Sequence, residues 1–119
     1  MTRARETSEN ARQAKAWVNF DGTFGSSPFT LANGGIRRAF NVSSITDNGV
    51  GSYTMNFAAA MPDANYSTLC TGPVASTLTR NFSAGFGTTD YTAGSVKLFR
   101  ESSDGNAADA SIFCVAVFH

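Results

Sequence analysis

The sequence predicts an all-β protein: one antiparallel β-sandwich of about seven strands that follows a short N-terminal arm. From residue 16 onward, short runs of β-branched and aromatic residues are separated by Gly, Asn, Asp and Pro. Between residues 52 and 57, Tyr, Met and Phe alternate with Ser, Thr and Asn, which is typical of a strand with one buried face. At 119 residues the chain has the size of one domain. We therefore expect an arm over residues 1–15 and a single sandwich over residues 16–119.

The arm is polar and contains neither Gly nor Pro, so it can form a short helix. Small residues recur there at alternating spacings of three and four, as in a coiled-coil seam: Ala4, Thr7, Ala11, Ala14 and Val18. Two heptads of Ala and Thr bury little area, so a solvated arm without a stable helix is the alternative.

The first half of the sandwich contains its clearest local unit, a hairpin. Residues 16–20 and 36–42 form the first two expected strands. Residues 43–46 and 52–57 then flank residues 47–51, where Asn and Gly supply the positive φ angles that a tight turn requires. We expect these two segments to pair as antiparallel strands.

The second half is less regular. Residues 66–71 form one expected strand, whereas the Gly- and Thr-rich stretch 78–95 predicts long loops or irregular edge strands. Residues 96–100 and 110–118 form the last pair, with a turn at residues 104–106.

The final segment, residues 110–118, is an almost unbroken apolar run, so we expect both faces of this strand to be covered. One face would lie in the domain core, and the other against a second sheet or another copy of the chain. One face carries Phe113, Val115 and Val117, and the other carries Ile112, Cys114, Ala116 and Phe118. The pattern leaves open which face is which. Our working hypothesis places Phe113, Val115 and Val117, together with Trp17, at a contact between copies.

Three stretches resemble a module found in bacteriophage tail fibres and related virion proteins. These are residues 15–23, with Ala16, Trp17 and Val18, residues 36–49, and residues 61–66, which begin Met-Pro-Asp-Ala-Asn. The resemblance spans most of residues 15–119. It implies a virion structural protein that is a homotrimer, either a tail fibre or a tail-associated component.

The same resemblance suggests what the chain contacts. We expect the arm, with its basic residues Arg3, Arg5, Arg12 and Lys15, to dock the protein to other tail or capsid proteins. A receptor-binding module that recognises a host cell-surface glycan is the alternative, and a capsid-decorating protein is a further one.

Isolated aromatic residues in the stretch 78–95 are the candidates for ligand binding: Phe82, Phe86 and Tyr91. Exposed rings on a loop can stack on a sugar or anchor a protein partner. The alternative is that these rings fold back over the sandwich or are buried in a subunit contact.

The sequence predicts neither an enzyme nor a cofactor. The only histidine, His119, is the last residue, and the aspartates lie mostly in expected turns, where turn chemistry explains them. Residues 104–109 place Asp and Asn at spacings that can bind calcium, but the closing Glu of such a loop is missing, so we expect a plain loop and no metal.

Charge and cysteine content limit the other classes of function. The net charge is zero and the basic residues form no face, which argues against a nucleic-acid partner. The longest apolar run is too short to cross a membrane as a helix, and the first ten residues do not form a secretory signal. We therefore expect assembly in the host cytoplasm, residence in the virion, and free thiols at Cys70 and Cys114 rather than a disulfide.

Overall fold

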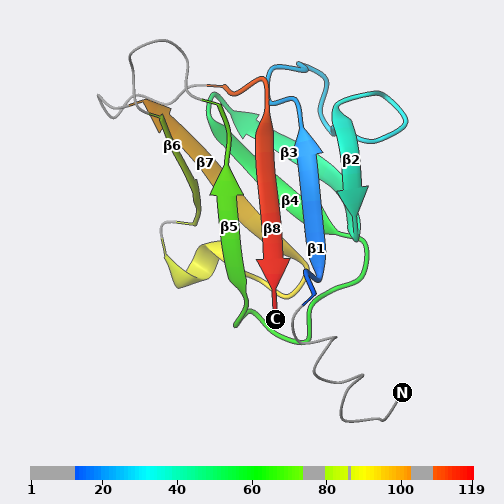
Figure 1. Cartoon of the computed structure of the whole chain (residues 1–119), viewed down its shortest axis with the longest axis vertical. Helices are drawn as coiled ribbons and strands as arrows, with labels where there is room; N and C mark the ends of the chain where they lie inside the picture. The colour runs from blue at the N-terminus through cyan, green and yellow to red at the C-terminus, as the bar shows by residue number, and fades with distance from the viewer. Residues whose placement is uncertain (1–12, 74–79, 86, 103–108) are drawn as a thin grey trace.

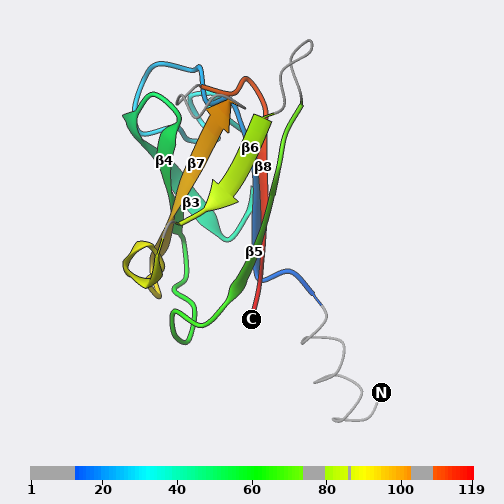
Figure 2. The same cartoon turned by 90° about the vertical axis from the view of Figure 1, so that its left-hand side faces the viewer.

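The computed structural model describes residues 13–73, 80–85, 87–102 and 109–119. Within these residues, eight strands form two antiparallel four-stranded sheets that pack face to face (Figures 1 and 2). The all-β sandwich expected from the sequence is confirmed, with one strand more than expected. The strands are β1 (Ala16–Phe20), β2 (Ile36–Phe40), β3 (Val42–Gly49), β4 (Ser52–Phe57), β5 (Ser67–Thr71), β6 (Arg80–Ala84), β7 (Ser95–Ser102) and β8 (Phe113–Phe118).

Each sheet combines strands from different parts of the chain. One sheet, here called the terminal sheet, has the order β2-β1-β8-β5 and contains the first and last strands. The other, the hairpin sheet, has the order β3-β4-β7-β6. A short 3-10 helix, η1 (Thr88–Asp90), precedes β7. The expected hairpin is confirmed, because β3 and β4 pair antiparallel through the turn that Gly49 and Gly51 form with positive φ angles.

The core lies between the sheets and is rich in aromatic rings. Phe20 on β1 stacks on Phe113 of β8 with ring centroids 5.2 Å apart, and the edge of Tyr53 from β4 meets Phe20 at the same distance. Tyr53, Met55 and Phe57 are all buried, as their alternation predicts. Rings of this size contribute much of the buried apolar area of a small domain.

Asn41 separates β2 from β3, so the boundary between the two expected strands 36–42 and 43–46 lies at residue 41. The segment 36–42 was expected to be continuous, but Asn41 has a φ of 56° and turns the chain from the terminal sheet into the hairpin sheet. Asn tolerates this conformation better than most residues. Its side chain holds the corner: Nδ2 donates to the carbonyl oxygens of Lys15 and Ala59, and Oδ1 accepts from the backbone N–H of Ala59 at 2.7 Å.

The last strand, β8, has one face in the core and one face outside. Phe113, Val115 and Val117 are buried between the two sheets of their own chain, whereas Cys114, Ala116 and Phe118 are half-buried on the outward side. The assignment of Phe113, Val115 and Val117 to a contact between copies is therefore wrong. In a sandwich each sheet has only one inner face, and these side chains occupy it.

The stretch 78–95 contributes β6, an edge strand that pairs only with β7 in its sheet, and the turn of η1. An edge strand in this stretch was one of the two structures expected, and β6 confirms it.

Candidate functional site

The outward side of the terminal sheet, which faces the viewer in Figure 1, carries a row of apolar side chains across its strands. Trp17 on β1 lies opposite Phe40 on β2 and Ala116 on β8, and Ala116 lies opposite Leu69 on β5. Residues paired in this way share a face, so the four side chains form one continuous line. Phe40, Trp17 and Leu69 are 54%, 40% and 65% exposed. We call this line the apolar row.

A hollow of about 390 Å³ lies in the same face, along β8. Ala116 and the neighbouring Cys114 are small, and they lie between the larger Trp17 on one side and Leu69 on the other. The hollow is almost entirely apolar and is lined by Trp17, Val18, Asn19, Leu69, Thr71, Cys114, Val115 and Ala116. A shape with large side chains beside a trough suits the side chains of another protein surface better than it suits a polar ligand.

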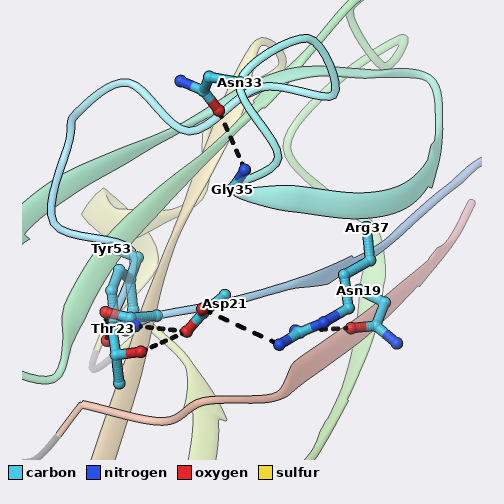
Figure 3. Close-up of polar contacts among 8 residues, drawn as sticks. Asn19, Asp21, Thr23, Asn33, Gly35, Arg37 and Tyr53 are labelled. Carbon is cyan, nitrogen blue, oxygen red and sulfur yellow. Dashed lines mark hydrogen bonds and ion pairs between the residues drawn. The ribbon is translucent and has the colours of Figure 1, made fainter.

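Positive charge lies along the β2 edge of this face. Arg37 and Arg38 are both exposed there. Figure 3 shows that Arg37 reaches towards β1: its Nη1 donates to Asn19 Oδ1 at 3.4 Å, and its Nη2 lies 4.0 Å from Asp21 Oδ2. The opposite edge, β5, presents the uncharged residues Ser67, Leu69 and Thr71. The two edges of the face therefore differ in charge.

Two of the three loop aromatics, Phe82 and Tyr91, are packed against the sandwich. Phe82 is half-buried, meets Phe113 edge-on at 5.0 Å, and lies 5.6 Å from the Arg100 guanidinium. Tyr91 is also half-buried, and its hydroxyl donates to the carbonyl oxygen of Ala84 at 2.9 Å. These two rings fold back over the sandwich, which was the alternative structure. Phe86 lies outside the described residues.

Tyr91 nevertheless borders a second hollow, of about 280 Å³, at the end of the sandwich near η1. Its other lining residues are Ala64, Asn65, Tyr66 and Thr88. Tyr66 is fixed there because its hydroxyl shares its one proton between the carbonyl oxygens of Thr92 and Ser95. The hollow combines aromatic surface with an amide and a hydroxyl group.

Other expected sites are only partly within the described residues. Arg3, Arg5 and Arg12 lie outside them, and Lys15 precedes β1 with its backbone N–H donating to the carbonyl oxygen of Val117 at 2.7 Å. The loop considered for calcium is also outside, apart from Asp109. One carboxylate oxygen of Asp109 accepts from the Gly51 N–H and the Tyr53 hydroxyl.

His119 and Asp63 form a pair on the surface. His119 Nε2 lies 3.0 Å from Asp63 Oδ1. The backbone N–H of Asn65, and after it His119, lower the pKa of Asp63. Among the described residues, no three His, Cys, Asp or Glu side chains gather as a metal site would require. The same part of the chain has no helix long and apolar enough to span a membrane.

The two cysteines lie on opposite sides of the terminal sheet. Cys70 is opposite Val115 and packs against the core, whereas Cys114 is opposite Thr71 on the outward side. Both are free, as expected. Burial raises the pKa of Cys70 to about 12, so this thiol stays protonated across the physiological range.

The raised pKa of Cys70 predicts a loss of stability in alkaline solution. In the unfolded chain Cys70 ionises near its ordinary pKa of about 9, whereas in the fold it keeps its proton up to about 12. The unfolded state therefore binds fewer protons over this interval, and the free energy of unfolding falls as the pH rises through it. Urea unfolding of the wild type and of Cys70→Ala at pH 7.5 and 10.5 measures the effect. Between these two pH values we expect the free energy of unfolding to fall less in Cys70→Ala than in the wild type. Equal decreases in the two proteins would contradict the raised pKa of Cys70.

Two residues of the apolar row, Phe40 and Leu69, were not singled out from the sequence. Each lies in a segment expected to form a strand, but the pattern there does not show which side faces the core. When the chain was compared with protein-family models, with curated protein sequences and with solved structures, no match was found.

Proposed function

We propose that this chain is a non-enzymatic structural subunit of a bacteriophage virion, a tail-fibre or tail-associated component that works as a homotrimer. The observation that carries the proposal is the apolar row. Phe40, Trp17 and Leu69 expose large side chains side by side, and burying one such side chain contributes about 1.5–3 kcal/mol. The resemblance of residues 15–23, 36–49 and 61–66 to phage tail-fibre modules supports the identity of the assembly.

A non-enzymatic role fits the chemistry of this face. The hollow along β8 contains one ionisable side chain, Cys114. Burial raises the pKa of Cys114, although Arg37 acts in the opposite direction, so the reactive thiolate is disfavoured. A thiol held in its neutral form behaves as a small apolar packing group.

Attachment to the particle is assigned to the arm. In this proposal the basic residues Arg3, Arg5, Arg12 and Lys15 dock to other tail or capsid proteins, and the sandwich projects from that point. The protein assembles in the host cytoplasm and is then part of the virion.

Light scattering of the purified chain tests the proposal, with Trp17→Ser as the informative variant. For the wild type we expect light scattering to give a particle with three times the mass of one chain. Trp17→Ser should raise the dissociation constant at least about 30-fold, equivalent to about 2 kcal/mol for loss of a central aromatic contact. Leu31→Ser is the matched control, because Leu31 is 56% exposed but lies outside both sheets. A folded wild-type monomer would contradict the proposal. Equal dissociation constants for Trp17→Ser and Leu31→Ser would also contradict it.

Recognition of a host-cell glycan is the second candidate function. The hollow near η1 favours it, because Tyr91 offers ring surface on which a sugar can stack, and Asn65 and Thr88 offer hydrogen bonds. Binding of the labelled protein to host cells separates this function from a purely structural one, and the location of the protein on the particle separates a tail component from a capsid decoration.

A further inference from the structure

We infer that copies of the chain assemble about an axis parallel to the strands of the terminal sheet, so that β2 of one copy meets β5 of the next. This inference rests on the proposed self-assembly and specifies its geometry. The contact that defines it is Phe40 of one copy against Leu69 of its neighbour. Four independent features of the outward face lead to this arrangement: the order of side chains in the apolar row, the width of the sheet, its charge and the direction of its edge strands.

The order of side chains in the apolar row suits such an axis. Across the sheet the row reads Phe40, Trp17, Ala116 and Leu69, with a large residue at each edge. In a ring of three copies around this axis, the outward face of each terminal sheet is turned towards the axis. The strands of each copy follow in the same order around the ring. The β2 edge of each copy then meets the β5 edge of the next, which brings Phe40 against Leu69 at every corner. Trp17 and Ala116, from the two middle strands, face the axis as alternating large and small groups.

The width of the sheet matches a closed three-fold ring. Four strands spaced about 4.8 Å apart make a face about 19 Å wide. Three faces of that width close into a triangle whose sides lie about 5.5 Å from the axis. Sheets packed face to face lie about 10 Å apart, so each stands about 5 Å from the plane between them. A ring of three therefore has room for one layer of side chains and leaves no open channel.

Charge favours the same axis. The next row along the sheet reads Arg38, Asn19, Cys114 and Thr71. A two-fold axis that lies in this face perpendicular to the strands would place β2 over β2, so that Arg37 and Arg38 of both copies gather along the same edge, which is unfavourable. An axis parallel to the strands brings Arg38 against Thr71 instead. The net charge of zero also leaves no long-range repulsion between copies.

Strand direction allows the two edges to pair. The pairs β2 with β1, β1 with β8, and β8 with β5 are all antiparallel, so β2 and β5 run in opposite directions. Rotation about an axis parallel to the strands preserves these directions. The β2 edge of one copy therefore meets the β5 edge of the next as an antiparallel pair, in which backbone hydrogen bonds can form. This pairing would also cover two exposed sheet edges.

Cysteine cross-linking tests the geometry. In a chain without its natural thiols, Cys70→Ala with Cys114→Ala, we introduce Phe40→Cys and Leu69→Cys together and add a short bismaleimide. We expect covalent trimers as the main product on a denaturing gel. Each substitution alone should give monomers, because like positions do not meet. Leu31→Cys with Val50→Cys is the control pair, since both residues are exposed and lie outside the strands.

The outcomes separate this inference from the proposed function. Dimers formed by Phe40→Cys alone would overturn it, because they require β2 to meet β2. A cross-linked ladder that ends at dimers would also overturn it, because it excludes the ring of three. An oligomer in light scattering that gives no cross-link between positions 40 and 69 would overturn the inference and leave self-assembly intact. A monomer in light scattering would overturn the proposed function itself.

Discussion

Replacing Val115 with aspartate is expected to unfold the protein, whereas the same substitution at the next residue, Ala116, should leave the fold intact and prevent assembly. Val115 is 3% exposed and lies opposite Val18 and Cys70 on the inner face of the terminal sheet. A carboxylate there loses its water without gaining a partner, at a cost on the order of 5 kcal/mol. A domain of this size is stable by about 5–15 kcal/mol in total.

Ala116 is the matched control because it is on the same strand and faces the other way. An aspartate at this position reaches solvent through the hollow along β8 and remains hydrated in the monomer. It would be desolvated only when another copy covers the apolar row. Circular dichroism and urea unfolding measure the first effect, and light scattering the second. Cooperative unfolding of Val115→Asp at wild-type urea concentrations would contradict the burial of this position.

Replacing Gly22 with alanine should produce the second large effect, a loss of about 3 kcal/mol from overpacking. A Cβ at Gly22 would overlap the Tyr53 hydroxyl and would lie only 2.6 Å from the carbonyl oxygen of Ala110. Both groups are held in place. The Gly22 N–H donates to that same carbonyl oxygen at 2.7 Å, and the Tyr53 hydroxyl donates to the Gly22 carbonyl oxygen at 3.0 Å.

The Tyr53 hydroxyl cannot easily move to relieve this overlap. Its single proton is shared between the Gly22 carbonyl oxygen and Asp109 Oδ1, which lies 2.8 Å away, and this contact ties β4 to the segment that leads into β8. Burial, and after it the hydrogen bond to Asp109, raise the pKa of Tyr53, so the hydroxyl keeps its proton and remains a donor. The alanine must therefore displace either the ring or the backbone before β8.

Gly94→Ala is the control for this substitution, because a Cβ there would meet nothing within 4 Å. We expect its stability to stay within about 0.5 kcal/mol of the wild type. Thermal and urea unfolding of both variants measure the difference. Equal stabilities of Gly22→Ala and Gly94→Ala would show that the chain around Tyr53 relaxes freely, contrary to this account.

The hairpin of β3 and β4 illustrates what could be predicted from the sequence. The turn residues and the alternating Tyr53, Met55 and Phe57 act on residues close to them in the sequence. The local pattern is therefore enough to predict the hairpin. The corner at Asn41 could not be predicted in the same way. Asn occurs in strands and at turns, and its role here depends on Lys15 and Ala59, which are distant in the sequence.

The candidate site was predictable only in part. Trp17 was singled out, and it lies at the centre of the apolar row. Leu69 was not, because in the segment 66–71 either Leu69 or Cys70 could face the core. The structure turns Cys70 inwards because it pairs with the inward-facing Val115, and Leu69 then faces outwards.

An all-β sandwich, its main hairpin and a last strand that is apolar on both faces could all be predicted from the pattern of residues. Which of those two faces lies outside depends on how the strands pair and how the sheets pack. An alternation of apolar and polar residues identifies the inner face of a strand, but β8 has no such alternation, so its orientation is set by its neighbours. Pairing with β1 and β5 places Phe113, Val115 and Val117 inside, and leaves Cys114 and Ala116 on the outward face, with Ala116 in the apolar row.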